Sequence, residues 1–135
     1  MDKYPKQKLD PKWIETGMTL EIVEWTNSFG EYLATKDAKK PMTTGQIRKF
    51  YGEVKRIDAA IEKHTNDIPM LKPLLAYAVG RDKSTGKNTK IDDFEKELSK
   101  AIGAIRLEHV VADYKNFVQI FESIVAYHKY YGGRE

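Results

Sequence analysis

Residues 80–88 are the part of the sequence that comes nearest to a motif with chemistry of its own. Their glycine, lysine and hydroxyl side chains suggest a phosphate-binding P-loop, in which the N–H groups of a glycine-rich turn hold phosphates. The match fails because Gly80 and Gly86 are six residues apart instead of five, and because Asn88 stands where Ser or Thr must bind magnesium. No strand pattern precedes the stretch either. The sequence therefore predicts no nucleotide site here.

The remaining reactive side chains form no catalytic or metal-binding pattern. The histidines never lie at i, i+4 to one another or within an HExxH motif, and the chain has no cysteine. His128 lies in an aromatic-rich segment, so we expect a core or interface histidine. The dipole of a predicted helix explains the acidic residues near its start, which are Asp92, Asp93, Glu95 and Glu97. We therefore predict no catalytic residue, no metal and no cofactor, in a protein that is not an enzyme.

Basic residues are concentrated in the middle of the chain. The formal net charge of the whole sequence is +3, whereas residues 43–90 carry ten Lys or Arg against five Asp or Glu. Residues 1–42 are neutral by the same count, and residues 91–135 are acidic. This distribution is expected if one face of the protein meets a polyanion. A chance excess on a solvated surface explains it equally well, so charge alone leaves both interpretations open.

Four of these cations form two pairs whose spacing suits one helix face. Arg48 and Lys55, and likewise Lys49 and Arg56, are seven residues apart. In an α-helix that spacing returns to the same face about 10 Å along the axis. Cations so arranged can follow phosphates, and such contacts position a strand without reading its bases. Base stacking is a second way to bind RNA, but packing or a protein interface is favoured for Tyr127, Tyr130 and Tyr131.

Helices must position these residues, because helical periodicity dominates the chain and no strand alternation is sustained. The strongest signal is a capping box formed by Thr43 and Gln46 at the start of the second helix. Gly30 is expected to weaken the first helix. The third is apolar on nearly all sides, so we expect it to be buried on most of them. The first helix is expected at residues 19–37 and the third at residues 73–80. The fourth is expected from Thr89 to about 105, and the last from about 114 to Gly132.

We therefore predict an all-α fold, a compact bundle of about five helices, in a single domain spanning residues 1–135. Residues 1–17 are rich in lysine and interrupted by prolines, and we expect a flexible N-terminal extension. Residues 106–113 fit either a turn or a continuous helix, which allows a helix-swapped dimer. The longest apolar run, residues 74–79, is too short for a membrane span of about 20 residues. No secretory signal is visible, so we expect a soluble cytoplasmic protein.

Three segments of the sequence together resemble a known family. They are TTGQIRKF at 43–50, LKPLLAYAVGR at 71–81 and FESIVAYHK at 121–129. In this order they resemble landmark segments of the small subunit of the type III-A CRISPR (Csm) effector complex. The resemblance implies a non-catalytic, all-helical scaffold that stacks in several copies along the guide RNA and target RNA duplex. It also implies that the partners are other Csm subunits and further copies of the same chain.

The resemblance also implies which cations contact RNA. The positions that match basic residues of the family's segments are Arg48, Lys49, Lys72 and Arg81. Lys55, Arg56 and Lys129 are added from helix geometry and proximity alone. The alternative is a helical protein-interaction adaptor whose basic face meets an acidic partner. A small helical nuclease built on the scattered carboxylates is a weaker alternative, which only metal-dependent cleavage by pure protein would support.

Overall fold

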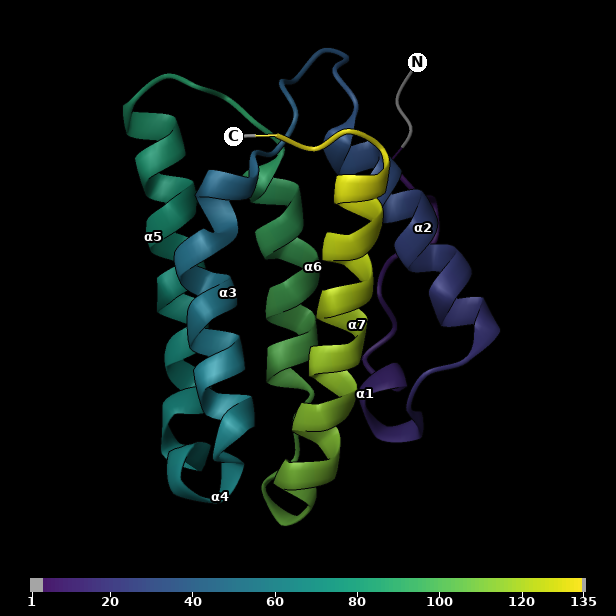
Figure 1. Ribbon diagram of the computed structural model, residues 1–135, viewed down its shortest axis with the longest axis vertical. Helices are drawn as coiled ribbons and strands as arrows, with labels where there is room; N and C mark the ends of the chain where they lie inside the picture. Colours follow the sequence, from purple (N-terminus) through teal and green to yellow (C-terminus); the bar gives the residue numbers. More distant parts are fainter. Residues whose placement is uncertain (1–3, 135) are drawn as a thin grey trace.

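The described residues, 4–134, form a bundle of α-helices in the computed structural model (Figure 1). Helices α3 (Thr44–Ala59), α5 (Leu71–Ser84), α6 (Ile91–Gly103) and α7 (Val110–Tyr130) lie side by side, and α2 (Leu20–Ala34) crosses against α7. Within these residues the only β-type pairing is an isolated bridge between Lys40 and Thr89. The all-α prediction is confirmed by helices α1 Trp13–Thr16, α2 Leu20–Ala34, α3 Thr44–Ala59, α4 Ile61–His64, α5 Leu71–Ser84, α6 Ile91–Gly103 and α7 Val110–Tyr130, with 3₁₀ turns η1 Thr65–Met70 and η2 Leu107–His109.

The start of α3 has the capping box that the sequence predicts. The Gln46 N–H donates to Thr43 Oγ1 at 3.2 Å, and the Thr43 N–H donates to Gln46 Oε1 at 2.9 Å. These bonds satisfy N–H groups that have no partner inside the helix. Apolar residues at helical spacing then point into the core, whereas Tyr51 on the same helix is exposed. The buried residues are Ile47, Phe50, Val54, Ile57 and Ile61.

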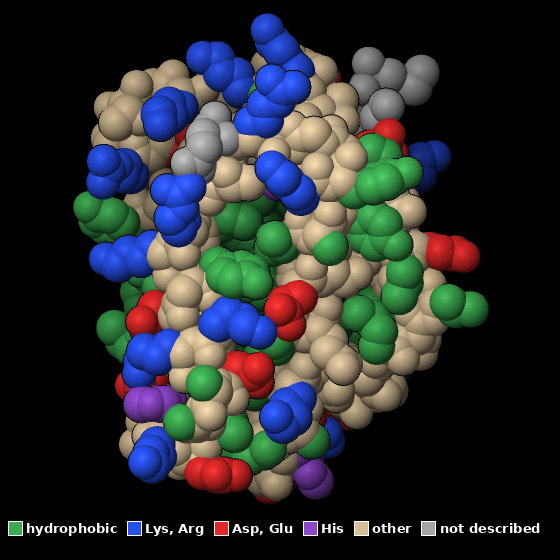
Figure 2. Space-filling model, in the orientation of Figure 1, with side chains coloured by type: hydrophobic (Ala, Val, Ile, Leu, Met, Phe, Trp, Pro, Cys, Tyr) green, Lys and Arg blue, Asp and Glu red, His purple; other side chains and the backbone are tan. Residues whose placement is uncertain are grey.

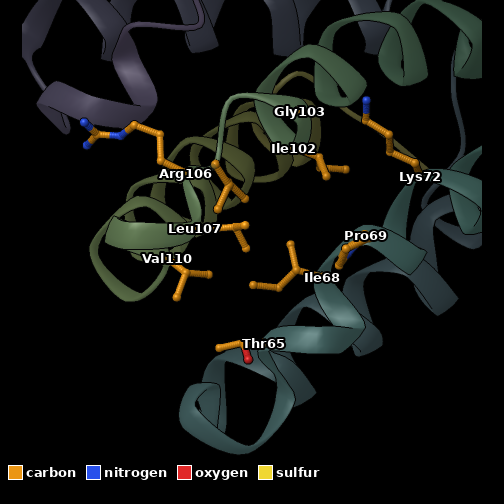
Figure 3. Close-up of a pocket in the computed structure, with 10 residues that line it drawn as sticks. Thr65, Ile68, Pro69, Lys72, Ile102, Gly103, Arg106, Leu107 and Val110 are labelled. Carbon is orange, nitrogen blue, oxygen red and sulfur yellow. The ribbon is translucent and has the colours of Figure 1, made fainter.

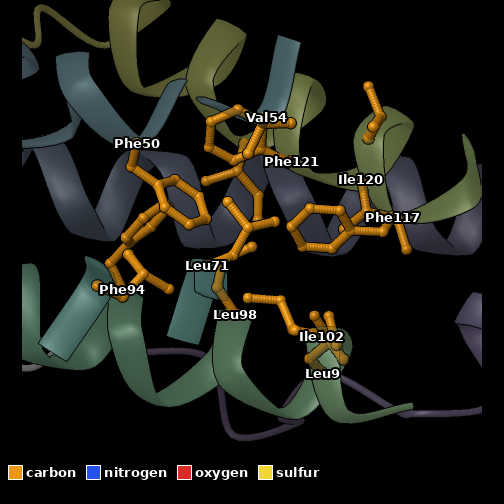
Figure 4. Packing of buried hydrophobic residues seen from close by; sticks show 14 of the residues in the cluster. Leu9, Phe50, Val54, Leu71, Phe94, Leu98, Ile102, Phe117, Ile120 and Phe121 are labelled. Atoms are coloured by element: carbon orange, nitrogen blue, oxygen red, sulfur yellow. The ribbon is translucent and has the colours of Figure 1, made fainter. Parts of the chain in front are cut away.

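The core lies between the long helices and is rich in phenylalanine (Figure 4). The Phe50 ring meets the rings of Phe94 and Phe121 edge-on, with centroids 6.2 and 5.3 Å apart. Edge-on pairs are favourable because the positive ring edge faces the negative ring face. One cluster of buried side chains extends from Leu9 to Ile124, which supports our proposal of a single domain.

The N-terminal segment packs against the bundle, so the prediction of a flexible extension is wrong for residues 4–17. Leu9, Trp13 and Ile14 are buried. The Leu9 N–H donates to Glu97 Oε1 at 2.9 Å, and Trp25 Nε1 donates to the carbonyl of Gln7 at 2.8 Å. These few apolar residues lie among lysines and prolines without sustained helical periodicity, so no sequence pattern reveals their burial. Residues 1–3 lie outside the described part.

Helix α5 is longer and more exposed than the sequence predicts. It covers residues 71–84 instead of 73–80, because Pro73 lies in the first turn, where its missing N–H costs no helical bond. The prediction of burial on most sides is wrong. The helix lies at the edge of the bundle against α3, η1 and α6, so one side of its apolar surface faces solvent, including Tyr77 at 65% exposure.

The connection between α6 and α7 is a turn, held by one ion pair. Asp113 is buried, and it accepts from the backbone N–H of Arg106 at 2.9 Å and from the Arg106 guanidinium at 2.9 and 3.0 Å. These hydrogen bonds hold the pKa of the Asp113 carboxyl below its ordinary value. With this turn in place α7 packs against the other helices of its own chain. The helix-swapped dimer stays a prediction.

Gly30 allows α2 to approach α7 closely, which is the reason for a glycine inside this helix. A Cβ on Gly30 would lie 2.6 Å from Tyr127 Cβ and 2.8 Å from the backbone N of His128. Both distances are below van der Waals contact, and the backbone of α7 cannot move aside without disturbing the core. The intrinsic cost of glycine in a helix, about 1 kcal/mol relative to alanine, is therefore outweighed by packing.

We predict that Gly30→Ala lowers the free energy of unfolding by about 1–3 kcal/mol, because overpacking outweighs the better helix propensity. Gly52→Ala is the matched control, since Gly52 lies within α3 and a Cβ there would meet nothing within 4 Å. That control should gain about 0.5–1 kcal/mol. Urea unfolding of both variants measures the difference, and equal stabilisation by both would contradict the close α2–α7 contact.

Candidate functional site

A groove lies between the N-terminal half of α3 and the C-terminal half of α5. It has a volume of about 690 Å³, and two of the predicted cations, Lys49 and Arg81, line it together with Lys87 and Tyr77. Lys49, Arg81 and Lys87 are exposed and make no ion pair within residues 4–134. Figure 2 shows Lys and Arg side chains gathered over this upper end of the α3 and α5 side, with most carboxylates lower down. The groove is thus a cationic surface available to a polyanion.

Buried hydrogen bonds fix the side of the groove where the two helices meet. Asp82 is only 4% exposed, and its Oδ1 accepts from Gln46 Nε2 at 2.8 Å and from Thr89 Oγ1 at 2.9 Å. Its Oδ2 accepts from the Thr89 N–H at 3.1 Å. The same Gln46 closes the capping box on Thr43. One network, which we call the Asp82 network (Thr43, Gln46, Asp82, Thr89), therefore joins α3, α5 and the loop that carries Lys87.

The two cations in the C-terminal half of α3 are ion-paired. Lys55 lies 3.1 Å from Glu122 of α7, and Arg56 donates to Glu53 and Asp67 at 3.0 and 3.1 Å. The Arg56 hydrogen bonds hold the pKa of both carboxyls below its ordinary value. Arg48 is exposed beside Lys49 but does not line the groove. The predicted seven-residue pairs therefore do not present four equivalent cations to one ligand.

Lys72 belongs to a different part of the surface. Nine residues separate it from Arg81, which places the two roughly 13 Å apart along α5 and on opposite sides of the helix. Figure 3 shows Lys72 at a second, smaller pocket of about 290 Å³ between η1, the start of α5 and the α6–α7 turn. Its lining is mostly apolar and includes Ile68 and Leu107, of which Leu107 is 89% exposed. Lys72 therefore lies outside the groove that Arg81 lines, and its RNA contact stays a prediction.

The C-terminal end of α7 is shaped by packing more than by charge. Lys129 is exposed there and lines neither pocket. Tyr131 donates to Asn27 Oδ1 at 2.5 Å, and its ring meets Tyr130 edge-on. Tyr127 is half-buried against the Tyr130 ring. Packing therefore explains the positions of Tyr127 and Tyr131, whereas Tyr130 is exposed.

Sequence reasoning missed Tyr77 and Lys87 as lining residues of the groove. The sequence predicts burial on most sides for the helix that carries Tyr77, and the failed P-loop match assigns no role to Lys87. One signal was available, because Tyr77 and Arg81 are four residues apart and therefore share a face of α5. An exposed aromatic residue beside a cation on one helix face is typical of nucleic-acid contacts.

The groups with catalytic potential are engaged in structural contacts. His128 is buried, its Nε2 lies 2.7 Å from the Met42 carbonyl, and burial lowers the pKa of its imidazole. Lys39 Nζ bonds Asp92 at 2.7 Å, and Tyr32 Oη donates to Asp93 at 2.6 Å. Within residues 4–134 no group of three or more His, Cys, Asp or Glu could hold a metal ion. In this same part of the chain, no helix is long and apolar enough to cross a membrane.

A protein-family comparison identifies the group of proteins to which this chain belongs. The model of the family described as Csm2 Type III-A matches residues 20–134, which is most of the chain. The chain belongs to the Csm2 type III-A family. Csm2 proteins are structural small subunits of the type III-A Csm complex, so the resemblance seen in the three sequence segments is confirmed. No curated protein and no solved structure matches the chain.

We predict that Asp82→Asn lowers the free energy of unfolding by about 1–3 kcal/mol. In the wild type both carboxylate oxygens accept hydrogen bonds from Gln46 and Thr89, whereas in the variant an NH₂ group, which cannot accept, replaces one of these oxygens. Backbone N–H groups of residues 85–90 should also exchange faster with solvent in the variant, since the loop loses its anchor. Glu62→Gln on α4 is a control at an exposed carboxylate. Unchanged stability and exchange in Asp82→Asn would show that the network does not hold the loop.

Proposed function

We propose that this Csm2 protein is a non-catalytic RNA-binding scaffold subunit of a type III-A CRISPR interference complex in the cytoplasm. Its groove between α3 and α5 faces the guide RNA and target RNA, and Lys49, Arg81 and Lys87 contact the phosphate backbone. The observation that carries the proposal is the groove itself, where three cations that make no ion pair within residues 4–134 line one hollow of the surface. Contacts between such side chains and phosphates are independent of sequence.

A scaffold role agrees with the distribution of charge in the chain. Lys55 and Arg56, which lie on α3 away from the groove, are paired with Glu122, Glu53 and Asp67. Lys49, Arg81 and Lys87 of the groove make no ion pair within residues 4–134. Surface ion pairs contribute little to stability, so their absence at the groove costs the fold little. With so few phosphate contacts a single copy binds RNA weakly, and stacking of several copies along the RNA would supply the affinity.

Contacts with neighbouring subunits require a surface separate from the RNA. We propose that the pocket beside Lys72 provides one, because Leu107 is largely exposed there and most of the lining is apolar. Protein interfaces have apolar centres, while phosphate-binding surfaces are cationic. The two pockets therefore divide the partners between two parts of the molecule, with RNA at the groove and a Csm subunit or second copy at the apolar pocket.

We predict that Lys49→Glu combined with Arg81→Glu weakens binding of labelled single-stranded RNA by tenfold or more at low salt, and makes the remaining binding less dependent on salt. Lys12→Glu combined with Lys96→Glu is the matched control, since it changes the net charge equally at exposed lysines outside the groove. Fluorescence anisotropy at several salt concentrations measures both. Equal weakening by the two double variants would mean that net charge, and not the groove, binds RNA.

A further inference from the structure

Tyr77 occupies a position in the groove that phosphate binding alone does not require. Its ring is 65% exposed on α5, one turn before Arg81, and it lines the groove opposite Lys49 of α3. An isolated exposed aromatic residue needs no explanation. This one lies inside a hollow that is also lined by three cations, Lys49, Arg81 and Lys87. An exposed aromatic residue among cations is typical of proteins that bind single-stranded nucleic acid.

The groove has room for a base, and its inner wall presents few free hydrogen-bonding groups that could distinguish one base from another. Its volume of about 690 Å³ falls within the about 300–1,000 Å³ of small-molecule sites. Both ends of the Gln46 side-chain amide are engaged, with Asp82 Oδ1 at Nε2 and the Thr43 N–H at Oε1. The Asp82 carboxylate is buried and accepts from Gln46 and Thr89, so it does not present its charge to a phosphate. A base there would be held by its face and not by its edges.

We propose that the groove holds an unpaired nucleotide of RNA, with its base stacked on Tyr77 and its adjacent phosphates held by Lys49, Arg81 and Lys87. The inference rests on the proposed function and adds the form of RNA that the groove accepts. In an A-form duplex the bases are stacked on one another and cannot reach an aromatic side chain, whereas a single strand or an extruded nucleotide can. Every base has a face to stack, so the preference is for unpaired RNA of any sequence.

The test uses the full chain and a single-stranded RNA that contains one 2-aminopurine, whose fluorescence falls when the base stacks. Binding by the wild type should quench the fluorescence. Tyr77→Leu should abolish the quenching and weaken single-strand binding about fivefold or more, the effect of losing one stacked base. Tyr77→Phe should retain both properties. Neither substitution should change binding of a blunt-ended duplex RNA, because the phosphate contacts remain.

Two results would overturn the proposal. Unchanged quenching and affinity in Tyr77→Leu would show that the base does not stack on Tyr77, and equal weakening toward single strand and duplex would show a purely structural role. Thermal unfolding of each variant verifies that the fold is intact, which the exposure of Tyr77 favours. Failure of the stacking proposal alone would leave the Lys49 and Arg81 charge reversal effective. Failure of the RNA-binding function would make that charge reversal no different from its control.

Discussion

The buried carboxylate of Asp82 is the contact on which the groove depends. It accepts from Gln46 of α3 and Thr89 of the following loop, and Gln46 in turn caps α3 through Thr43. Because a buried carboxylate is costly unless its hydrogen bonds are made, the three elements have one favourable arrangement. That arrangement places Lys49 on one side of the groove and Arg81 on the other.

Elsewhere in the bundle, carboxylates form ion pairs with cations and so make them less available to a ligand. Lys55 and Arg56 are held by carboxylates, and Arg106 closes the α6–α7 turn on Asp113. The cations of residues 43–90 are therefore not equally available to a ligand, because Lys55 and Arg56 are ion-paired whereas Lys49, Arg81 and Lys87 make no ion pair within residues 4–134. A modest net charge is thereby sufficient for one cationic surface on an otherwise balanced protein.

The features predictable from the sequence are local, and those that escaped prediction depend on neighbours. Thr43 and Gln46 are three residues apart and each accepts a hydrogen bond from the backbone N–H of the other, so their capping box can be recognised in the sequence. The exposed side of α5 cannot be predicted in this way, because residues 74–79 are all apolar and only the packed bundle shows which of them are covered. Lys55 pairs with Glu122, which lies 67 residues further along the chain. Sequence spacing therefore could not show that Lys55 is ion-paired and less available to RNA. Lys87 enters the site through the Asp82 network, which likewise leaves no local pattern.

Ultraviolet cross-linking of the intact Csm complex, loaded with guide and target RNA, tests the central claim most directly. Mass spectrometry of the digested complex locates the nucleotide adducts on this chain. Our account predicts adducts on the first turns of α3 and on the C-terminal half of α5, including the peptide that contains Tyr77. Adducts confined to other surfaces of the chain, with none on α3 or α5, would contradict it.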